Sequence, residues 1–232
     1  MLIILYMKTG TAFIQPHSDD AVMSMYYSIK SGYLPKPYFL VTAFSESDWV
    51  DPVQRIFLED SHINLSKEVV TDLRKYEDIE FANKCDMKCI FLCISDSKIR
   101  TGGAIFDPLV SLDGKIINEL HLKLNKTLSE IQVCTIVFPH PVGEKQHIDH
   151  RILFEVCGQL QGYTKYFSDD FPYSRVDDSI SFTNGNMVSA DSILEKFKMM
   201  SIYKTQMNSY FYEDVSHLHS KNGNTERLFK II

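Results

Sequence analysis

A regular alternation between short β-type runs and longer segments of helical periodicity limits the fold of this chain most strongly. Runs of β-branched, aromatic and other apolar residues predict four strands, at Thr11–Ile14, Tyr38–Phe44, Lys88–Ile94 and Cys134–Phe138. Two of the intervening segments carry apolar residues at helical spacing, namely Leu73, Tyr76, Ile79 and Ala82 in the first and Ile116, Leu120, Leu124 and Leu128 in the second. The recurring unit is therefore strand, helix, strand.

This alternation predicts an α/β fold of the Rossmann-like kind, with a mostly parallel sheet flanked by helices, because parallel strands need long crossover connections. The 232 residues, 44% of them hydrophobic, are enough for one sizeable core, and a single domain over residues 1–232 is expected. The tail adds a candidate strand at Ser179–Phe182 and a candidate helix at about Ser189–Tyr203. In such sheets, ligands bind at the carboxyl ends of the strands.

Composition narrows the classes of partner. A formal net charge of -6 gives no basic footprint for nucleic acid or for an anionic membrane surface. The segment Met1–Met7 is apolar but too short to span a bilayer, and it has neither a basic start nor a cleavage site. Five cysteines is an odd number, and Cys85, Cys89 and Cys93 are interpreted as reduced core thiols in preference to a disulfide framework or a metal site. We expect a cytoplasmic protein without an integral membrane segment, acting on a small molecule.

A first cluster of reactive side chains follows the first predicted strand. Its residues are His17, Ser18, Asp19 and Asp20, and on a turn the two adjacent carboxylates can point in different directions. One of them can bind a metal while the other faces the substrate. The competing interpretation is a helix cap, since serine and aspartate are good N-cap residues ahead of the apolar run Val22–Ile29. The two interpretations are compatible.

A second cluster follows the fourth predicted strand. His147 and His150 stand at i and i+3, so they would share the first turn of a helix that begins there. The spacing alone is weak evidence, but the preceding loop, which includes His140 and Lys145, is polar enough to line a substrate cleft. A catalytic zinc takes three ligands from His, Asp or Glu and leaves a fourth position for water. Two histidines and one carboxylate from the two clusters would supply that set.

Arg74 and Glu77 stand one helical turn apart in the first helical segment. On the surface such a pair would stabilise the helix by only a few tenths of a kcal/mol. Alternatively, Arg74 reaches the mouth of the active site and binds a hydroxyl or phosphate, with Glu77 holding its orientation. The sequence leaves these two hypotheses open.

Taken together, these motifs resemble the PIG-L/LmbE family of zinc-dependent deacetylases that act on N-acetylglucosamine conjugates. His17–Asp20 resembles the family's His-Pro-Asp-Asp-Glu motif, and Arg74–Ala82 resembles its Arg-x-x-Glu-x-x-x-x-Ala helix. His147–His150 is similar to the His-Pro-Asp-His motif, and Lys204–Gln206 loosely resembles a Ser-Gln segment. The resemblance runs through most of the chain.

The resemblance implies a role for each motif residue. His17, Asp20 and His150 would be zinc ligands, Asp19 the general base, and His147 the group that polarises the amide oxygen or protonates the leaving amine. A site of two imidazoles and one carboxylate can also hold another divalent metal. The implied substrate is an N-acetylated amino sugar or its conjugate.

Chemistry supports these roles. Zinc lowers the pKa of bound water to about 7, so a neighbouring carboxylate can remove a proton from that water near neutral pH. A protonated His147 would stabilise the negative charge that develops on the acetamide oxygen. Asp149, two residues further on, is expected to hold the ring of His147 and to favour its protonated form.

The chain departs from the family pattern in three places. Ser18 replaces proline, Ala21 stands where glutamate is usual, and Met23–Met25 replaces a glycine pair. Ala21 and the altered glycine pair keep open the alternative of a catalytically silent sugar-binding protein. Another metal-assisted ester or phosphate hydrolase is also possible, because the fold alone does not choose the reaction.

Overall fold

The computed structural model describes residues 8–103, 106, 111–141, 146–173, 185–189, 192–222 and 225–231. Its strands are β1 (Thr11–Gln15), β2 (Tyr38–Thr42), β3 (Met87–Phe91), β4 (Thr135–His140), β5 (Thr164–Asp169), β6 (Gly185–Ser189) and β7 (Thr225–Lys230). Its helices are α1 (Asp20–Ser24), α2 (Tyr26–Ser31), α3 (Pro52–Asp60), α4 (Lys67–Lys84), α5 (Ser97–Thr101), α6 (Gly114–Glu130), α7 (Ile148–Gln159), α8 (Ile193–Met200) and α9 (Ser209–Asn222).

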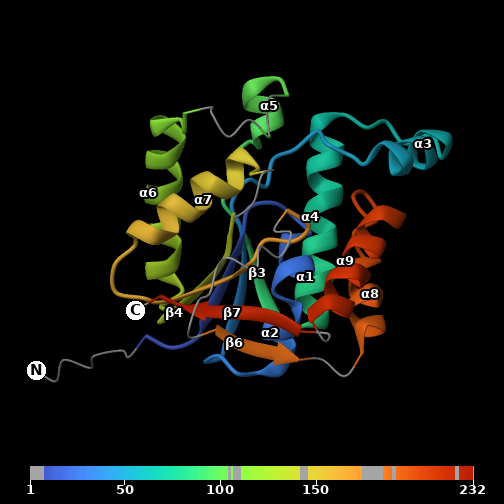
Figure 1. Cartoon of the computed structure of the whole chain (residues 1–232). Helices are drawn as coiled ribbons and strands as arrows, with labels where there is room; N and C mark the ends of the chain where they lie inside the picture. Colours follow the sequence, from blue (N-terminus) through green and yellow to red (C-terminus); the bar gives the residue numbers. More distant parts are fainter. Residues whose placement is uncertain are drawn as a thin grey trace, which may run out of the picture.

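One seven-stranded sheet organises these elements, in the order β3-β2-β1-β4-β5-β7-β6 (Figure 1). The first five strands are parallel, while β7 pairs antiparallel with both β5 and β6. The predicted α/β class with a mostly parallel sheet is therefore confirmed, and each of the four predicted strands overlaps an observed one.

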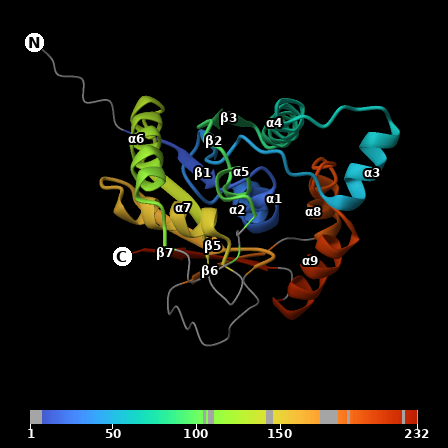
Figure 2. The same ribbon diagram turned by 90° about the horizontal axis from the view of Figure 1, so that it is seen from above.

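Side chains that alternate along the strands supply two separate cores, one on each face of the sheet. In β1, Phe13 packs into the core beneath α1, α2, α4, α8 and α9. Its neighbours Ala12 and Ile14 point the other way, into the core formed with α6 and α7. Both views show α6 and α7 on one side of the molecule and α4, α8 and α9 on the other (Figures 1 and 2). The result is a helix–sheet–helix sandwich.

The predicted helices occur, but one of them was given the wrong buried face. In α6, Leu120, Leu124 and Leu128 are fully buried, as predicted. In α4, Ala82 of the predicted apolar face is buried, but Tyr76 and Ile79 are exposed. The buried residues of α4 include polar and charged side chains instead, namely Thr71, Arg74, Glu77 and Asp78. The physical reason is that α4 turns these groups toward the polar carboxyl end of the sheet.

Other sequence expectations fare differently. Within the predicted helix Ser189–Tyr203, the structure has the shorter α8, whereas the predicted strand Ser179–Phe182 lies outside the described residues. Cys85 and Cys89 are unpaired and half-buried, but Cys93 is exposed, so the core interpretation is wrong for Cys93, which lies beyond the end of the edge strand β3. None of the described helices has the length and apolarity to cross a bilayer.

The carboxyl ends of the parallel strands all meet at one edge of the sheet. β1 leads into His17, β2 into Ser45–Trp49, and β3 into Asp96 and Ser97, the latter the first residue of α5. β4 leads into the loop before His147, and β5 ends next to Asp170. Residues far apart in the sequence are thereby collected into one region.

The two faces of α6 give a direct test of this packing. Replacing the fully buried Leu124 by alanine is expected to lower the free energy of unfolding by about 2–5 kcal/mol, because the cavity adds to the lost burial. The matched change Leu122→Ala on the same helix, where the side chain is 71% exposed, should stay within about 0.5 kcal/mol. Urea unfolding followed by circular dichroism measures both, and equal losses would contradict the assigned face of α6.

Candidate active site

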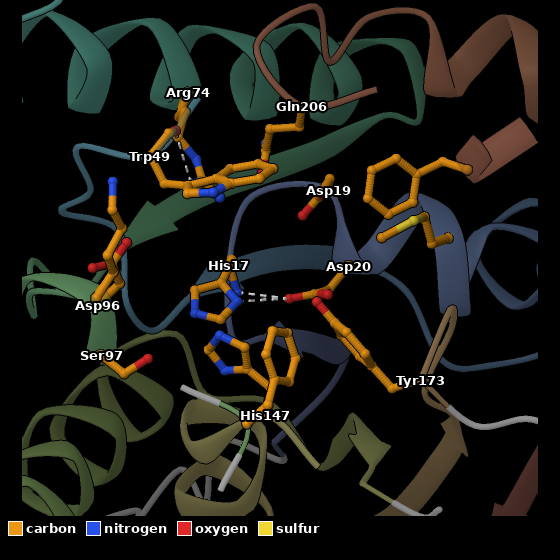
Figure 3. Close-up of a pocket in the computed structure, with 14 residues that line it drawn as sticks. His17, Asp19, Asp20, Trp49, Arg74, Asp96, Ser97, His147, Tyr173 and Gln206 are labelled. Atoms are coloured by element: carbon orange, nitrogen blue, oxygen red, sulfur yellow. Dashed lines mark hydrogen bonds and ion pairs between the residues drawn. The ribbon is translucent and has the colours of Figure 1, made fainter. Parts of the chain in front are cut away.

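A pocket of about 270 Å³ opens at the carboxyl edge of the sheet. The residues that line it come from both ends of the chain, and they are His17, Asp19, Asp20, Met23, Trp49, Arg74, Asp96, Ser97, Lys98, Phe106, His147, Tyr173, Gln206 and Phe211. The close-up of this pocket shows His17, Asp20 and His147 grouped near its centre (Figure 3). The two clusters predicted from the sequence therefore face one cavity.

The turn after β1 separates the two adjacent aspartates. Asp19 has a left-handed backbone (φ 98°), and its side chain makes no capping hydrogen bond to α1. Asp20 is the first residue of that helix, and its Oδ2 accepts a hydrogen bond of 2.8 Å from the backbone N–H of His17. A left-handed conformation is costly for a residue other than glycine and often marks a functional site. The helix-cap interpretation is therefore wrong for the side chain of Asp19, which lines the pocket.

The ring of His17 is held from both sides. Its Nε2 lies 2.9 Å from Oδ2 of Asp149, and its Nδ1 lies 3.5 Å from Oδ2 of Asp20. The Asp149 carboxylate also accepts hydrogen bonds of 2.7 Å from the backbone N–H of Ser97 and 2.6 Å from Nη2 of Arg100. Asp149 is thereby fixed by α5, so its carboxylate can orient the imidazole of His17.

His150 is arranged in the same way. Both carboxylate oxygens of Asp170 lie 2.9 Å from its Nδ1. Its Nε2 is buried without a hydrogen-bond partner among the described residues, and it lies 3.5 Å from Oδ2 of Asp20. One nitrogen of each imidazole is therefore used by a carboxylate, while the other faces the same oxygen of Asp20.

The charges around these imidazoles favour a cation. Burial by itself would lower the pKa of His17, but hydrogen bonds and charge from Asp149 and Asp20 outweigh it and raise the pKa to about 10. For His150, too, burial is outweighed by Asp170 and Asp20, which raise its pKa. For Asp20, burial is outweighed by the two histidines, and its pKa is lowered. The negative potential that holds protons on these rings would equally hold a metal ion.

The donor atoms fit a metal centre. His17, His147 and His150, and likewise Asp20, His150 and Asp170, offer ligand atoms within 4.8 Å of one another, and all are buried. A carboxylate on the far nitrogen of a histidine is the usual support for a metal-binding imidazole. An unpartnered buried nitrogen on His150 is expensive unless a ligand satisfies it. This group of histidines and aspartates can therefore bind a metal ion.

His147 differs from the expectation in its protonation. The backbone N–H of Asp149 donates to its Nδ1 over 3.2 Å, whereas the Asp149 carboxylate contacts His17 and Arg100 instead of this ring. Burial, followed by the charges of His17 and His150, lowers the pKa of His147 to about 2. The charge of Asp149 acts in the expected direction and raises the pKa of His147, but burial and the two neighbouring histidines outweigh it, and the carboxylate itself hydrogen-bonds to His17. The neutral ring carries its proton on Nε2.

Asp19 sits beside this group and lines the pocket. Burial, assisted by the neighbouring charge of Asp20, raises its pKa well above the ordinary value. In Figure 3 its carboxylate points into the pocket above Asp20. The adjacent aspartates therefore occupy different environments, one between two histidines and the other facing the cavity.

Arg74 lies at the pocket wall, as the functional hypothesis expected. It is 5% exposed, and its guanidinium donates to Ser47 Oγ over 2.9 Å and to the Ser18 carbonyl over 3.3 Å. Glu77 does not form a surface pair with it. The Glu77 carboxylate instead accepts hydrogen bonds from the backbone N–H and the hydroxyl of Thr205, at 2.7 and 2.6 Å. Glu77 thereby fixes the segment that brings Gln206 to the pocket.

His140 does not contribute to the described pocket. His140 is half-buried between the rings of Phe154 and Phe167, at 4.5 and 4.8 Å between centroids, and is not among the lining residues. Lys145 lies outside the described residues. Sequence reasoning missed Asp170, which directly follows β5 and could have been found by applying the strand-end rule to that strand.

Comparison with known proteins was made at the levels of family, sequence and structure. No protein-family model matches the chain, and no curated protein sequence matches it. The fold is similar to the crystal structure of the A40926 pseudoaglycone deacetylase Dbv21, with 17% identity and a TM-score of 0.70 over 97% of this chain and 98% of that one. These values show a shared fold along the whole length of both proteins.

Two more solved structures share the fold. A triple mutant of a deacetylase of the teicoplanin biosynthetic pathway has 15% identity and a TM-score of 0.71, covering 97% of this chain and 98% of its own. GalB, the 4-carboxy-2-hydroxymuconate hydratase from Pseudomonas putida KT2440, has 12% identity and a TM-score of 0.60, covering 96% of each chain. The same fold therefore carries both deacetylases and a hydratase, so the reaction must be argued from the site.

The carboxylate behind His150 provides a test of the metal centre. Asp170→Asn is expected to weaken metal binding by about 10- to 100-fold, because the ring loses the charged partner that orients it and raises its basicity. Equilibrium dialysis of zinc against a competing chelator measures the dissociation constant. Glu155→Gln, an equal charge change at an exposed position of α7, is the matched control, and equal affinity of the two variants would refute the role of Asp170.

Proposed function

We propose that this chain is a metal-dependent hydrolase that removes the N-acetyl group from an N-acetylglucosamine-type amino sugar or its conjugate. The observation that carries the proposal is the pair of carboxylate-held histidines that face Asp20, with the unligated carboxylate of Asp19 beside them. The overall likeness to two deacetylases and the motif resemblance agree with it. A linear amide, cleaved by water, is the bond at which such a site would act.

The metal would be held by Nδ1 of His17, Oδ2 of Asp20 and Nε2 of His150. These are the atoms left over when Asp149 and Asp170 have taken the other ring nitrogens. Each histidine nitrogen is 3.5 Å from the Asp20 oxygen, close to the roughly 3.3 Å expected between ligands that each lie about 2 Å from a tetrahedral zinc. Zinc is the proposed ion, and another divalent metal is compatible with the same ligands.

Such an ion supplies two effects, a lowered pKa of bound water and polarisation of the acetamide carbonyl. Asp19 is placed to take a proton from the attacking water, because it faces the cavity and serves neither as a helix cap nor as a ligand. The same carboxyl group can then pass that proton to the departing amine nitrogen. Water and amide are thereby converted into acetate and a free amino sugar.

His147 would stabilise the oxygen that becomes negative during attack. Its Nδ1 accepts from the Asp149 backbone, so the neutral ring presents an N–H at Nε2. A positioned donor of this kind typically contributes on the order of 100- to 1,000-fold to turnover. Arg74, which lines the same pocket, would orient the sugar through a hydroxyl group.

The alternative of a silent sugar-binding protein loses part of its motivation. Ala21, which stands where the resembled family has glutamate, is fully buried, and its backbone N–H donates to Oε1 of Gln15 over 2.8 Å. The substitution therefore supports the turn and removes no group from among the proposed ligands. Because the same fold also carries a hydratase, the fold does not fix the reaction, and metal-assisted hydrolysis of an ester or phosphate is the second candidate.

Replacement of the proposed base tests the reaction. Asp19→Asn should lower acetate release by about 100- to 10,000-fold, the range that general base catalysis contributes, while zinc content stays unchanged. Acetate is measured with zinc-loaded protein on a panel of N-acetylated sugars and conjugates. Asp72→Asn, at an exposed position of α4, is the control and should keep full activity.

Two results would contradict the proposal. Acetate release that survives Asp19→Asn would remove Asp19 from the mechanism. If the protein releases phosphate, or an alcohol from ester substrates, but no acetate from amides, the site catalyses the second candidate reaction instead.

A further inference from the structure

The pocket has a polar floor and an apolar wall. The floor consists of the histidines and aspartates described above. The wall is the set of apolar and aromatic lining residues Met23, Trp49, Phe106, Tyr173 and Phe211. In the view of Figure 3, Trp49 and Tyr173 lie on opposite sides of the pair formed by His17 and Asp20. A ligand at the floor is therefore flanked by aromatic rings.

One side of this wall packs directly against the proposed catalytic residues. The ring of Phe106 lies 5.2 Å from that of His147 and 5.6 Å from that of Tyr173, between centroids. Tyr173 lies 5.1 Å from the ring of His150. Phe106 nevertheless remains 41% exposed. Part of an aromatic surface next to the reaction centre is thus left uncovered by the described residues.

The other side is fixed by hydrogen bonds of the backbone. The Trp49 N–H donates to Ser47 Oγ over 3.1 Å, and its ring lies 6.0 Å from the guanidinium of Arg74. The first turn of α9, which carries Phe211, is held by Asn208, whose Oδ1 accepts from the Tyr210 and Phe211 N–H groups at 2.9 and 3.4 Å. The wall is therefore preorganised before a ligand binds, as expected for a preformed ligand site.

The charges in the pocket do not suit a phosphorylated substituent. Apart from the cationic histidines of the floor, which are held by their own carboxylates, two cationic side chains are among the described lining residues, and the protein already engages both. Lys98 lies 2.9 Å from Oδ1 of Asp48, and Arg74 is bound to Ser47 and to the carbonyl of Ser18. The carboxylates of Asp19 and Asp96 face the same space. A diphosphate would meet repulsion there without a dedicated partner.

We propose that the substrate is an N-acetylated amino sugar that carries an uncharged apolar substituent, aromatic or alkyl, which packs on the wall while the acetamide reaches the floor. This inference rests on the proposed deacetylase function and narrows its substrate class. It excludes nucleotide sugars as the preferred substrates. Each aromatic ring of the wall would then bury apolar area that the free protein exposes to water.

The single tryptophan of the chain is Trp49, so its fluorescence reports on this pocket directly. Zinc-loaded protein is mixed with phenyl or methyl N-acetyl-β-glucosaminide or with UDP-N-acetylglucosamine, and stopped-flow emission is read before turnover. The phenyl glycoside should bind on the order of tenfold more tightly than the methyl glycoside, because its ring is removed from water. The nucleotide sugar should bind no more tightly than the methyl glycoside.

Neighbouring aromatic residues of α9 provide the matched variants. Phe211→Ala should remove most of the tenfold preference for the phenyl glycoside, because the phenyl ring loses its contact with the wall. Tyr210→Ala, at a position 71% exposed and outside the pocket lining, should keep the preference. Because the comparison of the three ligands uses the unmodified protein, it does not depend on the folding of either variant.

The outcomes separate this inference from the function on which it rests. Equal binding of phenyl and methyl glycosides, or tighter binding of the nucleotide sugar, would overturn the inference that the substrate carries an apolar substituent, even if acetate is released. If Tyr210→Ala loses the preference for the phenyl glycoside as well as Phe211→Ala, the phenyl substituent does not bind at the wall. Tighter binding of the phenyl glycoside without acetate release from any amide would leave an apolar group on the wall but refute the deacetylase function, and with it the N-acetylated substrate.

Discussion

The hydrogen bonds between carboxylates and imidazoles are the interaction on which the active site depends. Asp149 holds His17 from a position 132 residues away in the sequence, and Asp170 holds His150. Each bond fixes which nitrogen of a ring remains available, and both available nitrogens face Asp20. Buried charges of this kind are tolerated only when they are paired. The pairs can form only after the parallel sheet has brought the ends of β1, β4 and β5 together.

A second buried carboxylate supports the turn from beneath. Asp78, on α4, is fully buried and accepts hydrogen bonds from Gln15, Ser18, Thr42 and Tyr203, at distances between 2.7 and 3.0 Å. These donors belong to the ends of two strands, to the turn after β1 and to the segment after α8. A carboxylate with this many donors connects the two halves of the chain under the site. It also explains why α4 turns a polar face inward.

A site residue could be predicted from the sequence where it follows a strand with a clear apolar pattern. It could not be predicted where tertiary contacts alone determine its position. His17, Asp20 and His150 could be found because they follow β1 and β4, strands that the apolar pattern makes visible. Asp170 was missed because β5 includes the polar residues Lys165 and Ser168, so no apolar run indicates a strand before it. The buried face of α4 escaped because apolar periodicity pointed to Tyr76 and Ile79, whereas tertiary hydrogen bonds bury the opposite, polar face. The residues of the pocket's aromatic wall come from separate segments of the chain, which lie close together only in the folded protein.

The central claim is that two carboxylate-held histidines and Asp20 form a ready-made metal site. Anomalous diffraction at the zinc edge, from crystals of the zinc-loaded protein, tests it most directly. The account predicts one strong anomalous peak about 2 Å from Nδ1 of His17, Oδ2 of Asp20 and Nε2 of His150, with the Asp149 and Asp170 hydrogen bonds intact. A peak coordinated by another set of residues, or no peak in this pocket, would contradict it.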